Sequence, residues 1–393
     1  MTTFTAVLSL PVSSVAGAGG SARYIVVLKD SADPDATARD HGRSYGADVS
    51  HVYRSALRGY AAVIPDARVD DVRRDTRVNY LSADREVSIA AQTLPTGINR
   101  IDGELSSTVS GNGSGAVSVD VAVIDTGIDL DHPDLNVVGG RNCSTGRSFN
   151  DGNGHGSHVA GTIAAKDDTQ GVVGVAPGAR LHAVRVLNNA GRGSFSSVIC
   201  GVDWVTANAS TIEVANMSLG GTGSEPSGSG CSTGDALHDA ICNSVAAGVT
   251  YAVAAGNEAD DAANHAPAAY DEVMTVSALA DFDGQPGGLG SSTCRTDVDD
   301  TFANFSNFGA DIDLIAPGVC ILSTWKGGGY NTISGTSMAS PHVAGAAALY
   351  KANNSGASPS QVKTALQNAG NSNWNDIDDP DPIKEILVNV DAF

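Results

Sequence analysis

Three short segments, far apart in the sequence, each carry one reactive side chain among glycine and other small residues. Asp125 ends an apolar run in VAVIDTGID, His155 follows a Gly-rich stretch in GHGSHVAGT, and Ser337 lies in GTSMASPHVAG. A serine at its ordinary pKa is a poor nucleophile, so it needs a base within hydrogen-bond reach and a carboxylate that orients this base. Asp125, His155 and Ser337 can supply these groups, and we predict that they form a catalytic triad for acyl transfer.

Such a serine also requires donors for the oxyanion that develops on the attacked carbonyl. Asn257, in AVAAGNEA, is predicted to supply one donor, and the backbone N–H of Ser337 at a helix N-terminus is predicted to supply a second. Each residue also has an ordinary structural interpretation: Asp125 as a turn or cap residue, and Ser337 as part of a buried helix. Pro341, four residues after Ser337, removes the backbone N–H that would have bonded the Ser337 carbonyl.

Two other kinds of active site fit the same residues poorly. A zinc protease motif needs histidines at i and i+4 with glutamate between them, whereas His155 and His158 are three residues apart without a glutamate. His158 is therefore predicted to be a buried hydrogen-bonding residue. An α/β-hydrolase esterase needs its serine in G-x-S-x-G and a different chain order, but Ser337 lies in GTSMA.

The elements that must position these residues have an alternating pattern. Apolar runs typical of buried parallel strands recur at 118–125, 180–187, 213–219, 249–255, 273–279 and 311–317. Helical stretches lie between several of them, and 333–350 reads as a helix that is apolar on every side and therefore buried. This alternation predicts an α/β fold, with a parallel sheet covered by helices on both faces. Ligands bind at the carboxyl ends of the strands in such sheets.

The amino-terminal part of the chain differs in character. Residues 1–20 form a short apolar run that ends in small residues, which is typical of a secretory signal. Residues 21–90 lack cysteine, and their order β-α-β-β-α-β predicts a small ferredoxin-like α+β domain. Its second helix is predicted over 66–81 and its last strand over 85–90. Residues 91–393 form the remaining domain.

The composition limits which binding partners and which cellular compartment we expect for this chain. The net charge of −21 disfavours nucleic acid and acidic membranes as partners, and no later apolar run is long enough to span a membrane. The scattered aspartates suggest a solvated surface. Six cysteines without a CxxC pair favour disulfides in an oxidising compartment. We predict sequential pairing, although six cysteines allow 15 connectivities. The predicted disulfides are Cys143–Cys200, Cys231–Cys242 and Cys294–Cys320.

Together, DTGID, GHGSHVAGT and GTSMASPHVAG make residues 91–393 resemble the subtilisin-like serine proteases (subtilases), and within them the proteinase K and aqualysin group. Ser157 departs from the family, which usually has threonine there. Residues 21–90 resemble the family's inhibitor I9-type propeptide, which assists folding and blocks the cleft until it is cut away. The resemblance implies autoprocessing near Ala90–Ala91.

The resemblance also implies a cleft that clamps an extended peptide by main-chain hydrogen bonds. One edge would be the strand Ser218, Leu219 and Gly220, and the other Gly191 to Gly193. Ala254, Ala255 and Gly256 would line a broad apolar pocket beside the scissile bond. Glu258, near the rim, would then admit a basic side chain as well.

Calcium is the ion that the resemblance implies, and no organic cofactor is expected. The first site would hold the mature amino terminus and would consist of Gln92, Asp134 and the loop residues Lys166, Asp168, Gln170 and Val172. A second site would combine Asp313 with carbonyl groups of Asp271 and Val273. Carboxylate and carbonyl oxygens suit a hard cation.

We therefore expect a secreted, monomeric serine endopeptidase that cleaves polypeptides, is stabilised by calcium and is made as a self-processing zymogen. The alternative is a catalytically silent, peptide-binding scaffold of the same family. That alternative requires the loss of a triad or oxyanion residue, and none is missing from this sequence.

Overall fold

The structure is a computed structural model that describes residues 20–84, 92–227 and 230–393. The chain divides into two compact units, Met1–Ile89 and Ala90–Phe393. Apart from Gly20, the predicted signal segment lies outside the described residues, and so does the predicted processing bond at Ala90–Ala91. In the described part of the chain, no helix combines the length and the apolar character needed to cross a membrane.

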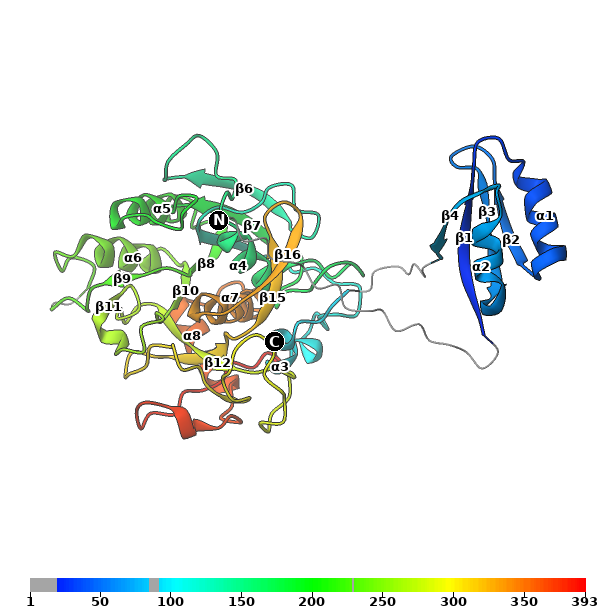
Figure 1. Ribbon diagram of the computed structural model, residues 1–393. Coiled ribbons are helices and arrows are strands. Elements are labelled where there is room, and N and C mark those ends of the chain that lie inside the picture. Colours follow the sequence, from blue (N-terminus) through cyan, green and yellow to red (C-terminus); the bar gives the residue numbers. More distant parts are fainter. Residues whose placement is uncertain (1–19, 85–91, 228–229) are drawn as a thin grey trace, which may run out of the picture. The chain divides into compact units, whose positions relative to one another are not determined.

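The first unit is a four-stranded antiparallel sheet, in the order β2-β3-β1-β4, with two helices (Figure 1). Its elements are β1 Ser21–Leu28, α1 Pro34–Tyr45, β2 Asp48–Tyr53, β3 Gly59–Pro65, α2 Asp66–Arg74 and β4 Val78–Ala83. Both helices contact β3 and each other, so they lie on one face of the sheet, over a core that includes Val26, Tyr60 and Ile64. This is the predicted ferredoxin-like arrangement.

The second helix of this unit is shorter than predicted. It ends at Arg74, and the last strand is Val78–Ala83 rather than 85–90, which lies outside the described residues. Asp75 ends the helix in an extended conformation, and its carboxylate accepts hydrogen bonds from the backbone N–H and the guanidinium of Arg77. This local pairing competes with continuation of the helix.

The second unit is built on an eight-stranded sheet in the order β13-β12-β10-β8-β5-β7-β6, with β14 paired to β12. The strands are β5 Asp120–Asp125, β6 Val137–Asn142, β7 Arg180–Arg185, β8 Ile212–Met217, β10 Thr250–Ala254, β12 Met274–Ala280, β13 Thr301–Phe302 and β14 Leu314–Pro317. The two short sheets pair β9 Gly221–Thr222 with β11 His265–Ala266, and β15 Ile321–Trp325 with β16 Gly329–Ile333. Each predicted apolar run coincides with a strand of the large sheet, which is parallel except where β13 pairs with β12.

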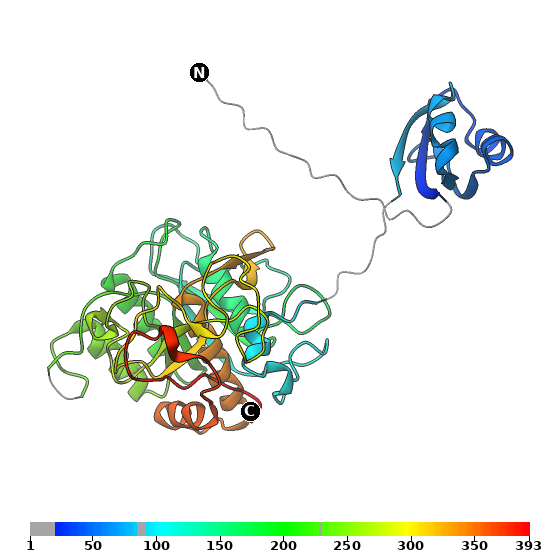
Figure 2. The same ribbon diagram turned by 60° about the horizontal axis from the view of Figure 1, so that its bottom comes forward.

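Helices cover both faces of this sheet (Figure 1). They are α3 Thr96–Arg100, α4 His155–Ala164, α5 Phe195–Ala207, α6 Ala236–Ala246, α7 Thr336–Asn353 and α8 Pro359–Ala369, with short 3₁₀ turns at Gly103–Leu105, Ala262–Asn264 and Asp376–Asp378. Side chains alternate along β5: Val121 and Val123 join the core under α4 and α7, whereas Ala122 and Ile124 join the core under α5 and α6. Figure 2 shows the C-terminal segment, coloured red, continuing from α8 along one side of the unit.

Some elements were not predicted, for identifiable reasons. Strand β6 lies at the sheet edge, is partly exposed and contains Gly139 and Gly140, so it lacks a continuous apolar run. Helix α8 begins with a reciprocal capping box between Ser358 and Gln361. The S-x-x-Q signature of that box is present in the sequence and could have revealed the helix.

The structure contains three disulfides, Cys143–Cys200, Cys231–Cys242 and Cys294–Cys320, which is the sequential pairing. The first joins the segment after β6 to α5, and the second joins the loop before α6 to α6 itself. All three lie in the second unit and restrict its unfolded chain.

Candidate active site

Asp125 and His155 meet at the carboxyl end of β5. Asp125 is fully buried, and His155 Nδ1 lies 2.8 Å from Asp125 Oδ1 and 2.9 Å from Oδ2. His155 is the first residue of α4, and a side chain on the next residue, Gly156, would collide with the carbonyl oxygen of Gly127. Glycine is therefore required for the start of α4 to approach Asp125 this closely.

The position of Asp125 sets the chemistry of the His155 ring. Because a carboxylate only accepts, Nδ1 carries the proton and Nε2 is left as the basic nitrogen. Burial lowers the pKa of His155, but the charge of Asp125 and its hydrogen bond outweigh this, so the pKa lies above its ordinary value. The ring is 25% exposed and borders a cavity, so it can act as a general base on a bound molecule.

Asp151 joins the end of β5 to the start of α4, and it was not identified from the sequence. Its carboxylate is buried and accepts bonds from the Thr126 hydroxyl at 2.9 Å, the Gly154 N–H at 2.9 Å and the Ser157 hydroxyl at 2.7 Å. Ser157, the residue that departs from the family pattern, thus keeps a hydroxyl that bonds Asp151. Asp151 begins the Gly-rich DGNGHG stretch, and an acidic residue before such a helix start was the signal that could have found it.

His158, one turn further along α4, has the structural role predicted for it. It is fully buried, and its Nε2 donates to the Ile321 carbonyl at 2.9 Å. Burial, the largest effect, lowers the pKa of His158 to about 3, so the ring is neutral.

Ser337 is the second residue of α7 and is tied to the segment after β8. Its hydroxyl donates to the Ser218 carbonyl at 3.4 Å, and the Ser218 hydroxyl donates to the Ser337 carbonyl at 2.8 Å. The Ser337 carbonyl is the group that Pro341 leaves without its helical N–H, so Ser218 replaces the missing donor. The role of the Ser218 side chain was not predicted.

Within the described residues, no hydrogen bond joins Ser337 Oγ to His155. Both residues adjoin Ser218, since Ser337 bonds it and His155 lines the same cavity. The hydroxyl must therefore turn from the Ser218 carbonyl toward the imidazole before a proton can move. Catalytic hydrogen bonds that are loose without substrate are common.

Asn257 lies three residues beyond β10 and is oriented by the start of α7. Its Oδ1 accepts from the Thr336 N–H at 2.8 Å and from the Thr336 hydroxyl at 3.1 Å. These bonds assign Nδ2 as the outward end of the amide, and no bond to another described residue uses it. Asn257 is exposed, so Nδ2 is available to donate to an oxyanion beside Ser337.

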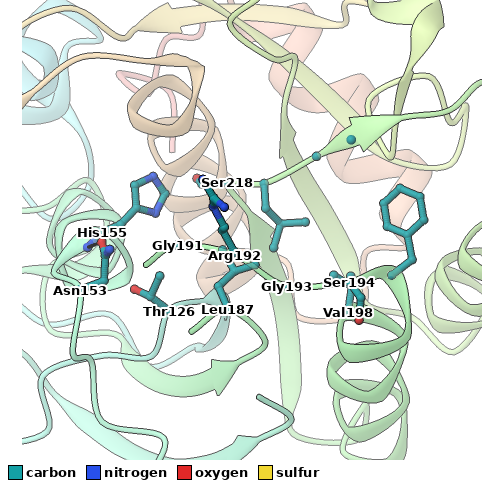
Figure 3. A pocket seen from close by; sticks show the side chains of 14 residues that line it. Thr126, Asn153, His155, Leu187, Gly191, Arg192, Gly193, Ser194, Val198 and Ser218 are labelled. Carbon is teal, nitrogen blue, oxygen red and sulfur yellow. Dashed lines mark hydrogen bonds between the residues drawn. The ribbon is translucent and has the colours of Figure 1, made fainter. Parts of the chain in front are cut away.

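The predicted cleft residues line two neighbouring cavities. The first, of about 620 Å³, contains His155, Gly191, Gly193, Ser218 and Gly220 in its wall (Figure 3). Apolar side chains of Leu187, Phe195 and Val198, which were not predicted, also line it. The guanidinium-bearing Arg192, which lies within the predicted edge Gly191 to Gly193, lines it as well.

The second cavity, of about 320 Å³, contains Ser337 and Asn257. Its wall includes the predicted residues Ala254, Ala255, Gly256, Leu219 and Gly220, together with Glu258. Leu219 to Gly221 border both cavities, so this extended segment separates them and can pair with a peptide along its length. The Glu258 carboxylate already accepts from the Asn257 N–H at 2.7 Å and from Asn307 Nδ2 at 3.1 Å.

The residues of the first predicted calcium site converge. Gln92 Nε2 donates to the carbonyl oxygens of Lys166, Gln170 and Val172 at 2.6, 3.2 and 3.1 Å. Gln92 Oε1 and Asp134 Oδ1 are buried without a hydrogen-bond partner. Burial raises the pKa of Asp134, and the negative charge of Asp168 raises it further. The three carbonyl oxygens and the Asp134 carboxylate fit a hard cation such as calcium, and Gln92 Oε1 joins them once the side-chain amide is turned end for end.

The second predicted calcium site does not fit a metal ion, and this prediction is corrected. Asp313 and the carbonyls of Asp271 and Val273 do converge, but on the ammonium group of Lys363. Lys363 Nζ lies 2.7 Å from Asp313 Oδ1, 2.9 Å from the Val273 oxygen and 3.3 Å from the Asp271 oxygen. A side chain on α8 thus provides the positive charge that we had assigned to calcium.

Comparison with known proteins agrees with this geometry. The family model described as Subtilase family matches residues 117–380, and that described as Peptidase inhibitor I9 matches residues 23–90. Subtilisin DY of Bacillus licheniformis is 42% identical over 280 residues, which cover 70% of this chain and 91% of that protein. The extracellular serine proteinase of Thermus sp. (strain Rt41A) is 41% identical over 379 residues, which cover 88% of this chain and 83% of that protein.

A solved structure is similar in fold as well. The crystal structure of a cold adapted subtilisin-like serine proteinase superposes with a TM-score of 0.61 at 36% identity, and covers 77% of this chain and 99% of that chain.

Proposed function

The chain belongs to the subtilase family of serine endopeptidases, and from this premise we propose that Asp125, His155, Ser337 and Asn257 catalyse its peptide-bond hydrolysis. The observation that carries this assignment is the hydrogen bonding of His155 Nδ1 to the buried carboxylate of Asp125, with Nε2 left as the base. The silent-scaffold alternative has no support, since the similar proteins are named as proteases and no proposed catalytic residue is absent.

In the proposed mechanism, Ser337 Oγ attacks the scissile carbonyl carbon while His155 Nε2 accepts the hydroxyl proton. Asp125 holds the ring and stabilises the imidazolium that forms. Asn257 Nδ2 and the Ser337 N–H donate to the oxyanion. The imidazolium then protonates the leaving amine as the C–N bond breaks, and water hydrolyses the resulting ester with His155 again as base.

We place the substrate along Leu219 to Gly221, with one side chain in the cavity beside Ser337. Ala254, Ala255 and Gly256 carry small or absent side chains, which supports a broad, apolar preference there. The rim carboxylate of Glu258 is engaged by Asn257 and Asn307, so it favours a basic side chain less than a free carboxylate would. A cleavage profile that shows a strict requirement for arginine or lysine would overturn this preference.

The I9 unit marks the protein as a zymogen with an intramolecular inhibitor. We place its removal near Ala90–Ala91. Secretion is supported by the three disulfides, which persist in oxidising compartments. We further infer a monomer without an organic cofactor, and the net charge of −21 disfavours nucleic-acid partners.

Subtilases commonly bind structural calcium, and we propose one such site here. Gln92, Asp134 and Asp168 would hold the ion with the carbonyl groups of Lys166, Gln170 and Val172. When bound, the ion would join the start of the mature chain to the loop that contains residues 166–172, which supports a structural rather than a catalytic role.

Replacing the nucleophile tests the assignment. The full-length Ser337→Ala variant should remain an uncut precursor and should not react with a fluorophosphonate probe. The matched control is Ser360→Ala, which changes an exposed serine of α8 and should be processed and labelled normally. Efficient self-cleavage or labelling of Ser337→Ala would overturn the proposed mechanism.

A further inference from the structure

A second cluster of chemically active groups lies around the start of α6. His238 Nε2 is 3.4 Å from Glu225 Oε1 and 3.2 Å from Glu272 Oε2. One ligand atom from each of the three residues lies within 4.8 Å of the other two. None of these residues lines the cavities described above.

The hydrogen bonds on the other side of the His238 ring fix where its proton lies. The Thr233 hydroxyl donates to Asp239 Oδ1 at 2.8 Å, because a carboxylate only accepts. The same hydroxyl oxygen lies 3.2 Å from His238 Nδ1 and must therefore accept a hydrogen bond from it. With a proton on Nδ1, the lone pair of the neutral ring lies on Nε2, on the side of the two glutamates.

The two carboxylates face the His238 ring and no other cationic side chain among the described residues. The His238 side chain is 2% exposed, and neither its Nε2 nor Glu272 Oε2 has a hydrogen-bond partner. Among the described residues, no lysine or arginine forms an ion pair with Glu225 or Glu272. A basic nitrogen and two carboxylates that approach one another without a proton or a cation between them would repel.

We propose that Glu225, His238 and Glu272 bind a divalent transition-metal ion, with zinc as the best match. Ligands that are 2.0–2.1 Å from a tetrahedral zinc ion lie about 3.3 Å apart, close to the two separations from Nε2. An imidazole ligand favours zinc over calcium, which takes oxygen ligands. Glu225 is 37% exposed, so water can complete the coordination.

The residues around Glu225, His238 and Glu272 hold these side chains in place, as residues around a metal-binding site do. Asp239 and Thr233 orient the imidazole through Nδ1, as outer residues do for metal-binding histidines. The Cys231–Cys242 disulfide attaches the loop that follows Glu225 to α6, one turn beyond His238. Lys363 bonds the carbonyls on both sides of Glu272. Each ligand is thereby held from a separate direction.

The site has a consequence for the cleft. Glu225 lies four residues after Gly221, which borders both substrate cavities. A metal ion that joins Glu225 to α6 would restrain the segment that leads away from the substrate-binding edge. We expect bound zinc to protect this segment from proteolysis and to raise the melting temperature.

Metal content tests the proposal independently of proteolysis. The full-length chain with Ser337→Ala, which prevents autolysis, is stripped with EDTA, supplied with excess calcium and titrated calorimetrically with zinc. One zinc ion per chain should bind at micromolar or tighter affinity and raise the melting temperature by a few degrees. Cobalt in place of zinc should give the visible absorption of a four-coordinate N/O site.

Matched variants locate the site. Glu225→Gln changes an exposed carboxylate and should fold normally but bind zinc at least about tenfold more weakly, and His238→Gln should abolish binding. His182→Gln is the control, because His182 pairs with Asp120, which Arg180 already neutralises, and it should bind zinc as the parent does. Absence of zinc uptake, or unchanged uptake by Glu225→Gln, would overturn the proposal.

Discussion

Replacing Lys363 by methionine tests the observation that a side chain, rather than a metal ion, neutralises Asp313. Methionine keeps most of the side-chain length and removes the ammonium group. The change leaves Asp313 and the carbonyls of Asp271 and Val273 without their shared partner. Since Asp313 is 16% exposed at its side chain, water replaces only part of what is lost.

The size of the effect follows from this partial burial. Losing a hydrogen bond to a charged group costs about 1.5–3 kcal/mol, and breaking a fully buried ion pair costs about 3–5 kcal/mol. Lys363 is 26% exposed, so the lower range applies and we expect a loss of about 2 kcal/mol. In a unit of this size, that corresponds to a decrease of about 4 °C in melting temperature.

The variant should also gain a calcium response beyond the one that the proposed site at Gln92 and Asp134 gives the parent. One carboxylate and two carbonyl oxygens become free to bind a hard cation, with affinity in the millimolar range because only one ligand is charged. Thermal melting is compared at one scan rate, in the Ser337→Ala background, with and without several millimolar calcium. Calcium should recover more of the melting temperature in Lys363→Met than in the parent.

Lys351→Met is the matched control. Lys351 is 6% exposed and bonds the carbonyls of Ser355 and Ala357 without a carboxylate partner. Its loss should lower stability and leave the calcium response unchanged. If Lys363→Met melts at the same temperature as the parent, or if its calcium response equals that of the parent, Lys363 does not replace a metal ion.

The remaining predictions concern catalysis and pH. Asp125→Asn should lower kcat for a chromogenic peptide by about 10⁴-fold, as the equivalent change does in trypsin-like enzymes. Because Asp125 raises the pKa of His155, the rising limb of kcat/KM against pH should have its midpoint above 6.5 in the parent enzyme, and a lower midpoint would contradict this. Asn257→Leu should lower kcat by about 10²–10³-fold, the range known for such a donor in subtilisin, with little change in KM. Burial and the charge of Asp379 raise the pKa of Glu385 to about 8, so the folded state keeps the proton on Glu385 where the unfolded chain has lost it. The free energy of unfolding therefore falls as the pH rises from 4.5 to 8. Glu385→Gln should melt above the parent at pH 9 and close to it at pH 5.

The sequence allowed us to predict those features that depend on one residue type within one local pattern. Asp125 and Asn257 follow apolar strands, and His155 and Ser337 begin small-residue helices, so each position could be read from its own segment. The meeting of Lys363 with Asp313 could not be read in this way, because it depends on α8 lying against the segment before β14, and α8 itself was not recognised. The same applies to Glu225, His238 and Glu272, which come from separate segments and share no motif.

The aspartates show what composition alone could not reveal about the acidic chain. We expected them on a solvated surface, and most of those described are not buried, but Asp129, Asp151 and Asp167 are, and each accepts hydrogen bonds from more than one group. Asp167 accepts from the N–H groups of Gly111 and Gly113, and Asp129 from those of Gly327 and Gly328. Glycine-rich loops leave backbone N–H groups without partners, and a carboxylate can satisfy two of them at once. Part of the aspartate content therefore satisfies the loops around the sheet, including the loop that positions His155.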